Sequence, residues 1–354
     1  MRRLLALLLL LMLCTGIPPA VRAEEDVTDI FDAAGLQAMA ARPGGTYRLA
    51  RDIDLRGIDW VPPVFSGTLD GNGHTIYNLT IRQAGEETRV AHDGNLKAYD
   101  TAFAGLFAVL DHATVRNLSL KGALVELEHP GHCFAALLTG FMDHAVIENV
   151  SVEGRVHLAT QGVMVGVGGL AGYGCGRFEG CGVEVELVFE DRNRQSRCEQ
   201  FLGAVLACGI CSMNACTVHL DAYNSCHGYA HNGGLMGMYF HCNTGYPRGP
   251  VTNCAISGRI TFFEDNRDRR AYCRPGIGEH LQRPTSTRGC SSRGFKKKEV
   301  RKFDRVLSPE TCESPVYDLA VTEPTADAWG FTRHTCTGCG YTWTDTYTPP
   351  TAEE

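Results

Sequence analysis

The sequence lacks the short motifs of the common catalytic folds. It has no Gly-x-Ser-x-Gly elbow, no phosphate-binding P-loop and no His-Glu-x-x-His zinc motif, which argues against the enzyme classes that use them. It also lacks an excess of positive charge, because 33 lysines and arginines stand against 40 aspartates and glutamates, for a net charge of -7. General nucleic-acid binding needs a basic footprint. We therefore predict no nucleic-acid partner and no cofactor.

Long apolar runs are absent beyond the start of the chain. Two arginines precede an unbroken apolar run over residues 4–14, and Pro18 and Pro19 end it. A charged start, a short apolar stretch and compact residues before a cut are typical of a secretory signal peptide. A helix that crosses the bilayer needs about 20 apolar residues, so a retained anchor is the weaker alternative. We predict a signal peptide over 1–23, an extracellular or cell-surface location, and no membrane span after signal removal.

The body of the chain carries an internal repeat. Five clusters of small and apolar residues have their second residue at 105, 136, 169, 203 and 234, in steps of 31, 33, 34 and 31, and a short alternating strand follows each. A repeat this short cannot bury its own apolar face, whereas stacked repeats cover one another. The β-branched content and the 40 glycines favour strands and tight turns. We predict an all-β, right-handed parallel β-helix over residues 24–262.

Stacking assigns a role to one apolar position per coil. The equivalent residues are Leu118, Val150, Cys181, Cys216 and Cys254, and a free cysteine behaves as a small hydrophobe. We predict an interior ladder. Neighbouring coils lie about 4.8 Å apart, so one disulfide within the ladder stays sterically possible beside the favoured buried free thiols.

Stacking also explains a recurrent asparagine. Asn78, Asn117, Asn149 and Asn253 precede the strands, and asparagine tolerates the left-handed backbone of a coil corner. Three of them sit in N-glycosylation acceptor sequences, but we predict a corner role first. Residues 32–41 read as a short helix with Asp32 as its N-cap, which we expect to cap the open end of the stack.

Several of these residues resemble a known repeat. Residues 44–57, the Trp60-Val-Pro-Pro stretch, residues 65–81 and Gly105-Leu-Phe look like GLUG-repeat β-helices, over roughly residues 28–258. Such repeats occur on exported proteins of Gram-positive, often gut-dwelling bacteria, and beside the catalytic domain of immunoglobulin A metallopeptidases. The resemblance implies an extracellular or surface-attached module in which adhesion or glycan contact is the usual role.

The C-terminal segment, 312–354, is similar to a small Cys-containing repeat at the ends of such proteins. Ser314 and Ala326 stand where that pattern has a histidine and a cysteine. A structural zinc site uses four ligands, mostly sulfur and nitrogen. The remaining candidates are Cys312, Cys336, Cys339 and His334. We therefore favour a disulfide or reduced thiols over a metal there.

Two further stretches carry possible ligand chemistry. Residues 263–311 form a basic stretch, predicted as an irregular linker or insertion, and Lys296, Lys297, Lys298 and Arg301 are its ligand-contact candidates. Positive patches attract anionic partners such as acidic glycans or surface polymers, although a solvated loop is the plainer interpretation. Zinc or copper ligand types also cluster at Cys226, His227 and His231, followed by His241 and Cys242. Ordinary loop histidines are the alternative.

We therefore predict a secreted or surface-attached, non-catalytic module for adhesion or for binding of glycans or host surfaces. The alternative is a β-helix polysaccharide lyase or glycoside hydrolase, and a hydrolase needs two carboxylates that face the scissile bond. Asp52, Asp54 and Asp70 are the acids to weigh, and no second acid row follows them in the sequence. Acids that converge in one groove would favour the enzyme, and exposed basic residues the binding module.

Overall fold

The protein is described by a computed structural model, which covers residues 26–85, 88–90, 99–192, 198–240, 245–263, 271–280, 283–300, 316–337 and 342–351. The predicted signal peptide lies outside these ranges. Within them the chain is almost entirely β, with one short α-helix. No helix in these ranges has the length and apolar character needed to cross a membrane.

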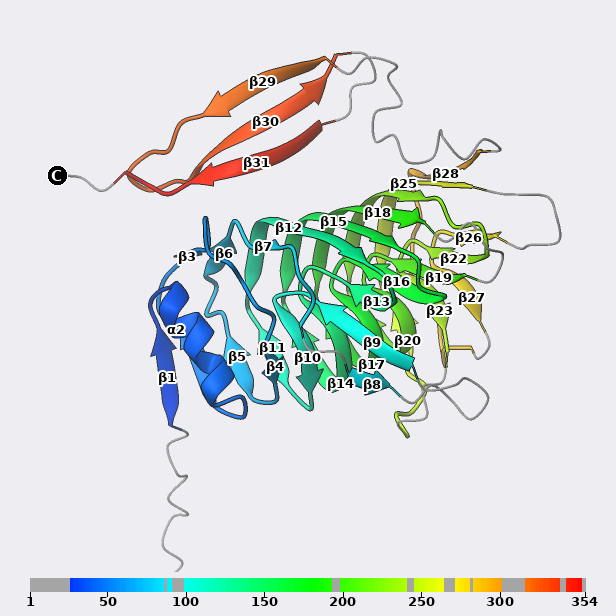
Figure 1. Ribbon diagram of the computed structural model, residues 1–354, viewed down its shortest axis with the longest axis horizontal. Coiled ribbons are helices and arrows are strands. Elements are labelled where there is room, and N and C mark those ends of the chain that lie inside the picture. Colours follow the sequence, from blue (N-terminus) through cyan, green and yellow to red (C-terminus); the bar gives the residue numbers. More distant parts are fainter. Residues whose placement is uncertain are drawn as a thin grey trace, which may run out of the picture.

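Three parallel sheets form the body of the molecule (Figure 1). Sheet A runs through β1 (Val27–Ile30), β2 (Thr46–Leu49), β5 (Thr68–Asp70), β11 (Thr114–Arg116), β14 (Thr139–Glu148), β17 (Ala171–Glu179), β20 (Leu206–Asn214), β23 (Met236–Tyr239) and β27 (Ile277–His280), with β4 (Val64–Phe65), β10 (Phe107–Asp111) and β24 (Val251–Thr252) beside that path.

Sheet B runs through β3 (Ile53–Asp54), β6 (Thr75–Tyr77), β12 (Ser119–His129), β15 (Ser151–Thr160), β18 (Gly182–Asp191), β21 (Thr217–Asn224), β25 (Ala255–Phe263) and β28 (Phe295–Val300), with β7 (Thr80–Ile81) beside β12. Sheet C runs through β8 (Thr88–Val90), β9 (Tyr99–Ala104), β13 (His132–Ala135), β16 (Met164–Gly168), β19 (Glu199–Gly203), β22 (Tyr229–Gly233) and β26 (Ala271–Arg274). Only β8 pairs antiparallel with its neighbour in these sheets.

The chain visits the sheets in a fixed order. Strands β13, β14 and β15 lie in sheets C, A and B, and the sets β16–β18 and β19–β21 repeat that order. Each coil stacks on the next in register, as in Val115 opposite Ile147 and Ile147 opposite Phe178. These interior positions are fully buried. The predicted all-β class and the stacked parallel arrangement of a β-helix are confirmed.

The predicted interior ladder is also confirmed, as is the corner role of three of the four asparagines. The interior ladder residues Leu118, Val150, Cys181, Cys216 and Cys254 are at most 1% exposed, and its cysteines are free thiols. Asn117, Asn149 and Asn253 have φ between 51° and 55° at the corner between sheets A and B, as predicted. Their amides bond to neighbouring coils, as Asn149 Nδ2 does to Asn117 Oδ1 at 3.3 Å. Asn78 has φ of 59°, but it lies within sheet B, between β6 and β7 and opposite Gly122 of β12, so its predicted corner role is wrong.

The N-terminal cap has the predicted form. Helix α2 (Ala33–Ala38) continues into the 3-10 turn η1 (Met39–Ala41), and the Asp32 side chain accepts a hydrogen bond from the Gly35 amide at 2.8 Å. Leu36 and Met39 are each 1% exposed, because they pack against the first coil. The helix thus covers the end of the apolar interior at the blue end of the stack in Figure 1.

Part of the stretch expected to be irregular is regular in the structure. Strands β26, β27 and β28 pair with β22, β23 and β25, one in each sheet. We call the described residues 271–280 and 283–300 the last coil. Its strand β28 is highly charged and lacks the apolar alternation that identifies the earlier coils in the sequence. The stack of coils therefore reaches residue 300.

The C-terminal residues form a separate antiparallel sheet. It contains β29 (Tyr317–Thr322), β30 (Gly330–Cys336) and β31 (Thr342–Thr348). The sheet folds back over the early strands of sheet B (Figure 1). The Trp329 ring stacks on Tyr77 at 3.6 Å between centroids, and Asn78 Nδ2 donates to the Tyr347 carbonyl at 3.0 Å. Contacts across more than 250 residues of sequence thus join the two ends of the chain.

Candidate functional site

A β-bulge in sheet A gathers three chemically active side chains. In the pairing of β14 with β17, Met142 lies opposite Gly174 and Ala145 opposite Gly176. Asp143 and His144 therefore share the single partner Cys175. Two residues opposite one is the pattern of a β-bulge, which redirects side chains and is frequent beside functional sites. His144 takes a left-handed backbone, with φ of 51°.

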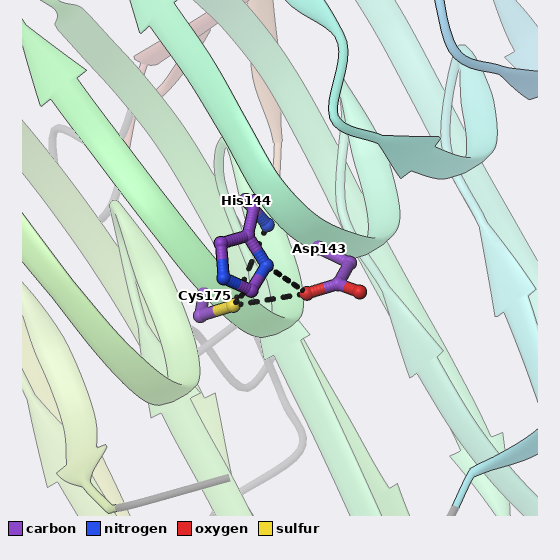
Figure 2. Close-up of side chains that lie close together, drawn as sticks. All are labelled: Asp143, His144 and Cys175. Atoms are coloured by element: carbon purple, nitrogen blue, oxygen red, sulfur yellow. Dashed lines mark hydrogen bonds and ion pairs between the residues drawn. The ribbon is translucent and has the colours of Figure 1, made fainter. Parts of the chain in front are cut away.

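The three side chains meet at one carboxylate oxygen (Figure 2). The distance from Asp143 Oδ1 to His144 Nδ1 is 2.6 Å, and the Cys175 thiol donates to the same oxygen at 3.2 Å. Cys175 Sγ lies 3.8 Å from His144 Nδ1 and accepts a hydrogen bond from the His144 amide at 3.4 Å. We call Asp143, His144 and Cys175 the bulge cluster.

The preceding coil repeats half of this arrangement. Asp111 lies in register with Asp143, and the distance from His112 Nδ1 to Asp111 Oδ1 is 2.6 Å. The His112 and His144 rings are stacked, with centroids 4.9 Å apart and planes 2° from parallel. The hydrogen bond to Asp111 raises the pKa of His112 above its usual value. Two Asp-His pairs thus lie side by side on adjacent coils at this surface.

Burial decides what chemistry the bulge cluster can perform. Cys175 is fully buried, whereas the Asp143 and His144 side chains are 30% and 32% exposed. A nucleophilic cysteine needs access and an imidazole base, with a third group that orients the base. Here the carboxylate oxygen is the group nearest the thiol, and the sulfur is covered. Nitrogen, oxygen and sulfur donors at these separations are instead a set that transition metals use.

The sequence holds a signal for this site that the repeat analysis missed. The tripeptide Asp-His-Ala occurs at 111–113 and again at 143–145, with a spacing of 32 residues. That spacing is the length of one coil, so the two tripeptides must lie side by side. Cys175 follows 32 residues after Asp143, which places its thiol on the next coil.

The predicted histidine-cysteine cluster is brought together only in part. Cys226 lies with Cys198 and Asp191, and all three are buried. His227 joins them, because its Nδ1 is 3.5 Å from Asp191 Oδ2. His231 lies apart, stacked between the rings of Phe201 and Tyr272. His241 and Cys242 lie outside the described residues.

The structure describes two of the four predicted C-terminal metal ligands. Cys336 is buried and His334 half-buried, both on β30. They stand two residues apart on one strand and so face the same side of the small sheet. Cys312 and Cys339 fall in the parts of the chain that the structure does not describe. A metal, a disulfide or reduced thiols there stay predictions.

The predicted ligand-contact lysines occupy the outermost strand of sheet B. Lys296, Lys297 and Lys298 are exposed on β28, and Lys297 lies in register with the buried Ile260. Lysine on an edge strand also discourages pairing with other chains, which is an ordinary structural role for them. Arg301 lies outside the described residues.

The carboxylates considered as candidates for hydrolysis accept hydrogen bonds that stabilise turns. Asp52 Oδ1 accepts from the Thr75 amide at 2.9 Å, and Asp54 Oδ1 from Asn78 Nδ2 at 2.7 Å. Partial burial raises the pKa of Asp70, but hydrogen bonds from the Asn72 amide and from the Asn117 and Arg116 side chains outweigh it and lower that pKa. A general acid needs a raised pKa, so Asp70 is unsuited to that part.

Comparisons with known proteins add little. No family model matches the chain, and no curated protein matches it significantly. A solved chain described as "IgA1 Protease" matches with a TM-score of 0.38 and 14% identity over 79% of this chain and 22% of its own length. A putative immunoglobulin A1 protease from Bacteroides ovatus matches with a TM-score of 0.31 and 12% identity, over 77% of this chain and 84% of its own. At such TM-scores the likeness carries no argument about the site.

Proposed function

We propose that the chain is a secreted or surface-attached, non-catalytic module of the GLUG-repeat kind that contacts an anionic polymer through its last coil. The charge of that coil carries the proposal. Residues 271–280 and 283–300 contain seven lysines and arginines and two glutamates, in a chain of net charge -7. The coil alone therefore has a charge of 7 − 2 = +5. All seven basic residues are exposed.

In the inner coils, positive charge is balanced by ion pairs between neighbouring coils. Their arginines pair with carboxylates of a neighbouring coil, as Arg116 does with Asp70 at 2.9 Å and Arg259 with Asp221 at 3.6 Å. The described residues of the last coil hold two glutamates and seven basic residues, so the charge is not balanced within this coil. Its positive field extends roughly one Debye length, about 8 Å at physiological salt, and therefore attracts polyanions.

The strand geometry suits a partner with repeated charges. Lys296 and Lys298 lie two residues apart on β28 and point to the same face, about 7 Å apart along the strand. A polymer with regularly spaced negative groups contacts both lysines at once, and linked contacts raise the overall affinity. Acidic glycans and anionic cell-surface polymers share this chemistry.

The test is a titration of the mature chain, Glu24 to Glu354, with a sulfated polysaccharide and with a neutral glucan. We expect saturable binding to the sulfated polymer alone, weakened by rising salt. The double variant Lys296→Ala with Lys298→Ala should lower the affinity at least several-fold. The matched control, Arg42→Ala with Lys121→Ala, removes two exposed cations from the other end of the stack and should bind as the parent does. Equal loss in both variants would show that only net charge matters, and the proposal would fail.

A further inference from the structure

We propose that the bulge cluster binds a divalent transition metal ion, with zinc as the best match. The ligands would be a carboxylate oxygen of Asp143, Nδ1 of His144 and Sγ of Cys175. These three donor atoms come from two adjacent coils and all lie within 4.8 Å of one another. This inference concerns a surface of sheet A and does not depend on the function proposed for the last coil.

The observed separations are close to those of a tetrahedral zinc site. With bond lengths of about 2.0–2.3 Å, the ligand atoms of such a site lie roughly 3.3–3.7 Å apart. The separations of Cys175 Sγ from Asp143 Oδ1, 3.2 Å, and from His144 Nδ1, 3.8 Å, are already near that range. Only the 2.6 Å between Asp143 Oδ1 and His144 Nδ1 has to widen, by about 0.7 Å. Both of these side chains are partly exposed, and a rotation of the Asp143 carboxylate alone can provide this widening while the His144 ring stays in place.

The donor types select the metal. A thiolate and an imidazole favour zinc or cobalt, whereas magnesium and calcium prefer oxygen ligands alone. Three protein ligands leave a fourth position for water, as in open zinc sites. The protonated Cys175 thiol donates a hydrogen bond to Asp143 in the structure, so metal binding must release the thiol proton to solvent. The affinity should therefore rise with pH.

The surroundings hold the histidine ligand in place and leave it accessible. The His144 ring stacks on His112 at 4.9 Å and meets the Tyr246 ring edge-on at 5.3 Å. Fixing the orientation of a ligand ring in this way strengthens metal binding. Asp143 is 30% exposed at its side chain, whereas Asp191 of the other acid-thiol group is 0% exposed. An ion added to the folded chain therefore reaches the bulge cluster more readily.

Cobalt(II) titration of the reduced, folded mature chain tests the proposal, because a cobalt-thiolate bond gives a near-ultraviolet charge-transfer band. We expect one such site per chain, displaced by zinc. His144→Gln and Asp143→Asn change partly exposed side chains and should each weaken binding at least 100-fold, more than the loss of an outer-shell partner. Cys175→Ser should remove the charge-transfer band.

Matched variants separate this site from the other thiols of the chain. Cys208→Ser changes another buried thiol of sheet A, and His219→Gln changes an exposed histidine on β21 of sheet B. Both should keep the band, with affinity altered by less than about tenfold. Circular dichroism checks that each variant is folded. A parent chain that shows no cobalt-thiolate band, or a His144→Gln variant that binds with the affinity and spectrum of the parent, would overturn the proposal.

Discussion

The corner between sheets A and B requires a left-handed backbone at one residue of each coil. Asn117, Asn149 and Asn253 meet this requirement, and Gly180 has φ of 63° at the same corner. Ala215 takes φ of 54° there, although it has neither the freedom of glycine nor the local hydrogen bonds of asparagine. This conformation costs an ordinary L-residue roughly 1–2 kcal/mol. One corner of the stack is therefore strained.

Replacing Ala215 should stabilise the protein. Ala215→Gly removes the strain but adds the entropy cost of glycine, about 0.5–1 kcal/mol, so we expect a net gain of up to about 1 kcal/mol. Ala215→Asn should also gain, since the side chain at this position is exposed. The measurement is the urea midpoint of unfolding. Ala255→Gly, at an ordinary strand position in β25, should lose stability, and a gain there would refute the conformational explanation.

Residue roles were predictable where they recur on every coil. The corner asparagines and the interior ladder follow from position in the repeat, because stacking fixes both backbone conformation and burial. The bulge cluster was not predicted, because its three residues differ in type and Cys175 replaces the Asp-His pair on its coil. These three side chains come together only because of the β-bulge between β14 and β17. A regular alternation of inward and outward strand residues does not predict a bulge.

At the scale of single elements, the lysines of strand β28 can have two roles, which are edge protection and ligand contact. Strand β28 is the last strand of sheet B, and no strand among the described residues pairs with its far edge. Lys297 occupies the register position of the interior residue Ile260. An inward-pointing charge on an edge strand prevents another strand from adding to the sheet. The same lysine-rich strand thus keeps chains apart while its outward lysines stay exposed.

Removing the inward charge should cause association between chains. Lys297→Val makes the inward-facing position of this edge strand apolar and β-branched, and we expect a larger mass by light scattering at micromolar concentration than for the parent. Lys121→Val changes an exposed lysine on β12, an inner strand with partners on both sides, and should keep the parent mass. An unchanged mass for Lys297→Val would mean that the edge is protected in some other way.

Strand β28 also shows why the last coil was hard to predict. Three lysines in succession carry no apolar alternation, so the sequence of this strand resembles a solvated loop. The strand forms because its main chain pairs with β25, whose buried residues fix the register. A local sequence pattern cannot predict a strand that forms because of such a tertiary interaction.

At the scale of the whole molecule, a titratable group joins the C-terminal sheet to the middle of sheet B. The Tyr347 hydroxyl donates a hydrogen bond to Glu153 on β15. Burial raises the pKa of Glu153 above its usual value, and the nearby Glu184 raises it further, although the Tyr347 bond acts in the opposite direction. Contacts over nearly 200 residues of sequence could not be predicted from the repeat.

The folded protein, with this sheet docked, should therefore lose stability against the unfolded chain as the pH rises. A carboxyl group whose pKa is raised by folding contributes stability below its unfolded pKa, about 4.3, and loses it as the pH passes the higher folded pKa. Trp329 fluorescence, isolated by subtracting the spectrum of Trp329→Phe, reports docking because the ring stacks on Tyr77. Glu153→Gln should make this stability insensitive to pH in this range. If the variant keeps the pH dependence of the parent, Glu153 is not its cause.

We propose above all that this stack of coils recognises an anionic polymer without altering it. The most direct measurement is a glycan array probed with the mature chain, run beside a reducing-sugar release assay on every polysaccharide that binds. We expect binding confined to anionic glycans, with no sugar released. Release of sugar from any of them, or binding to neutral glycans alone, would contradict it.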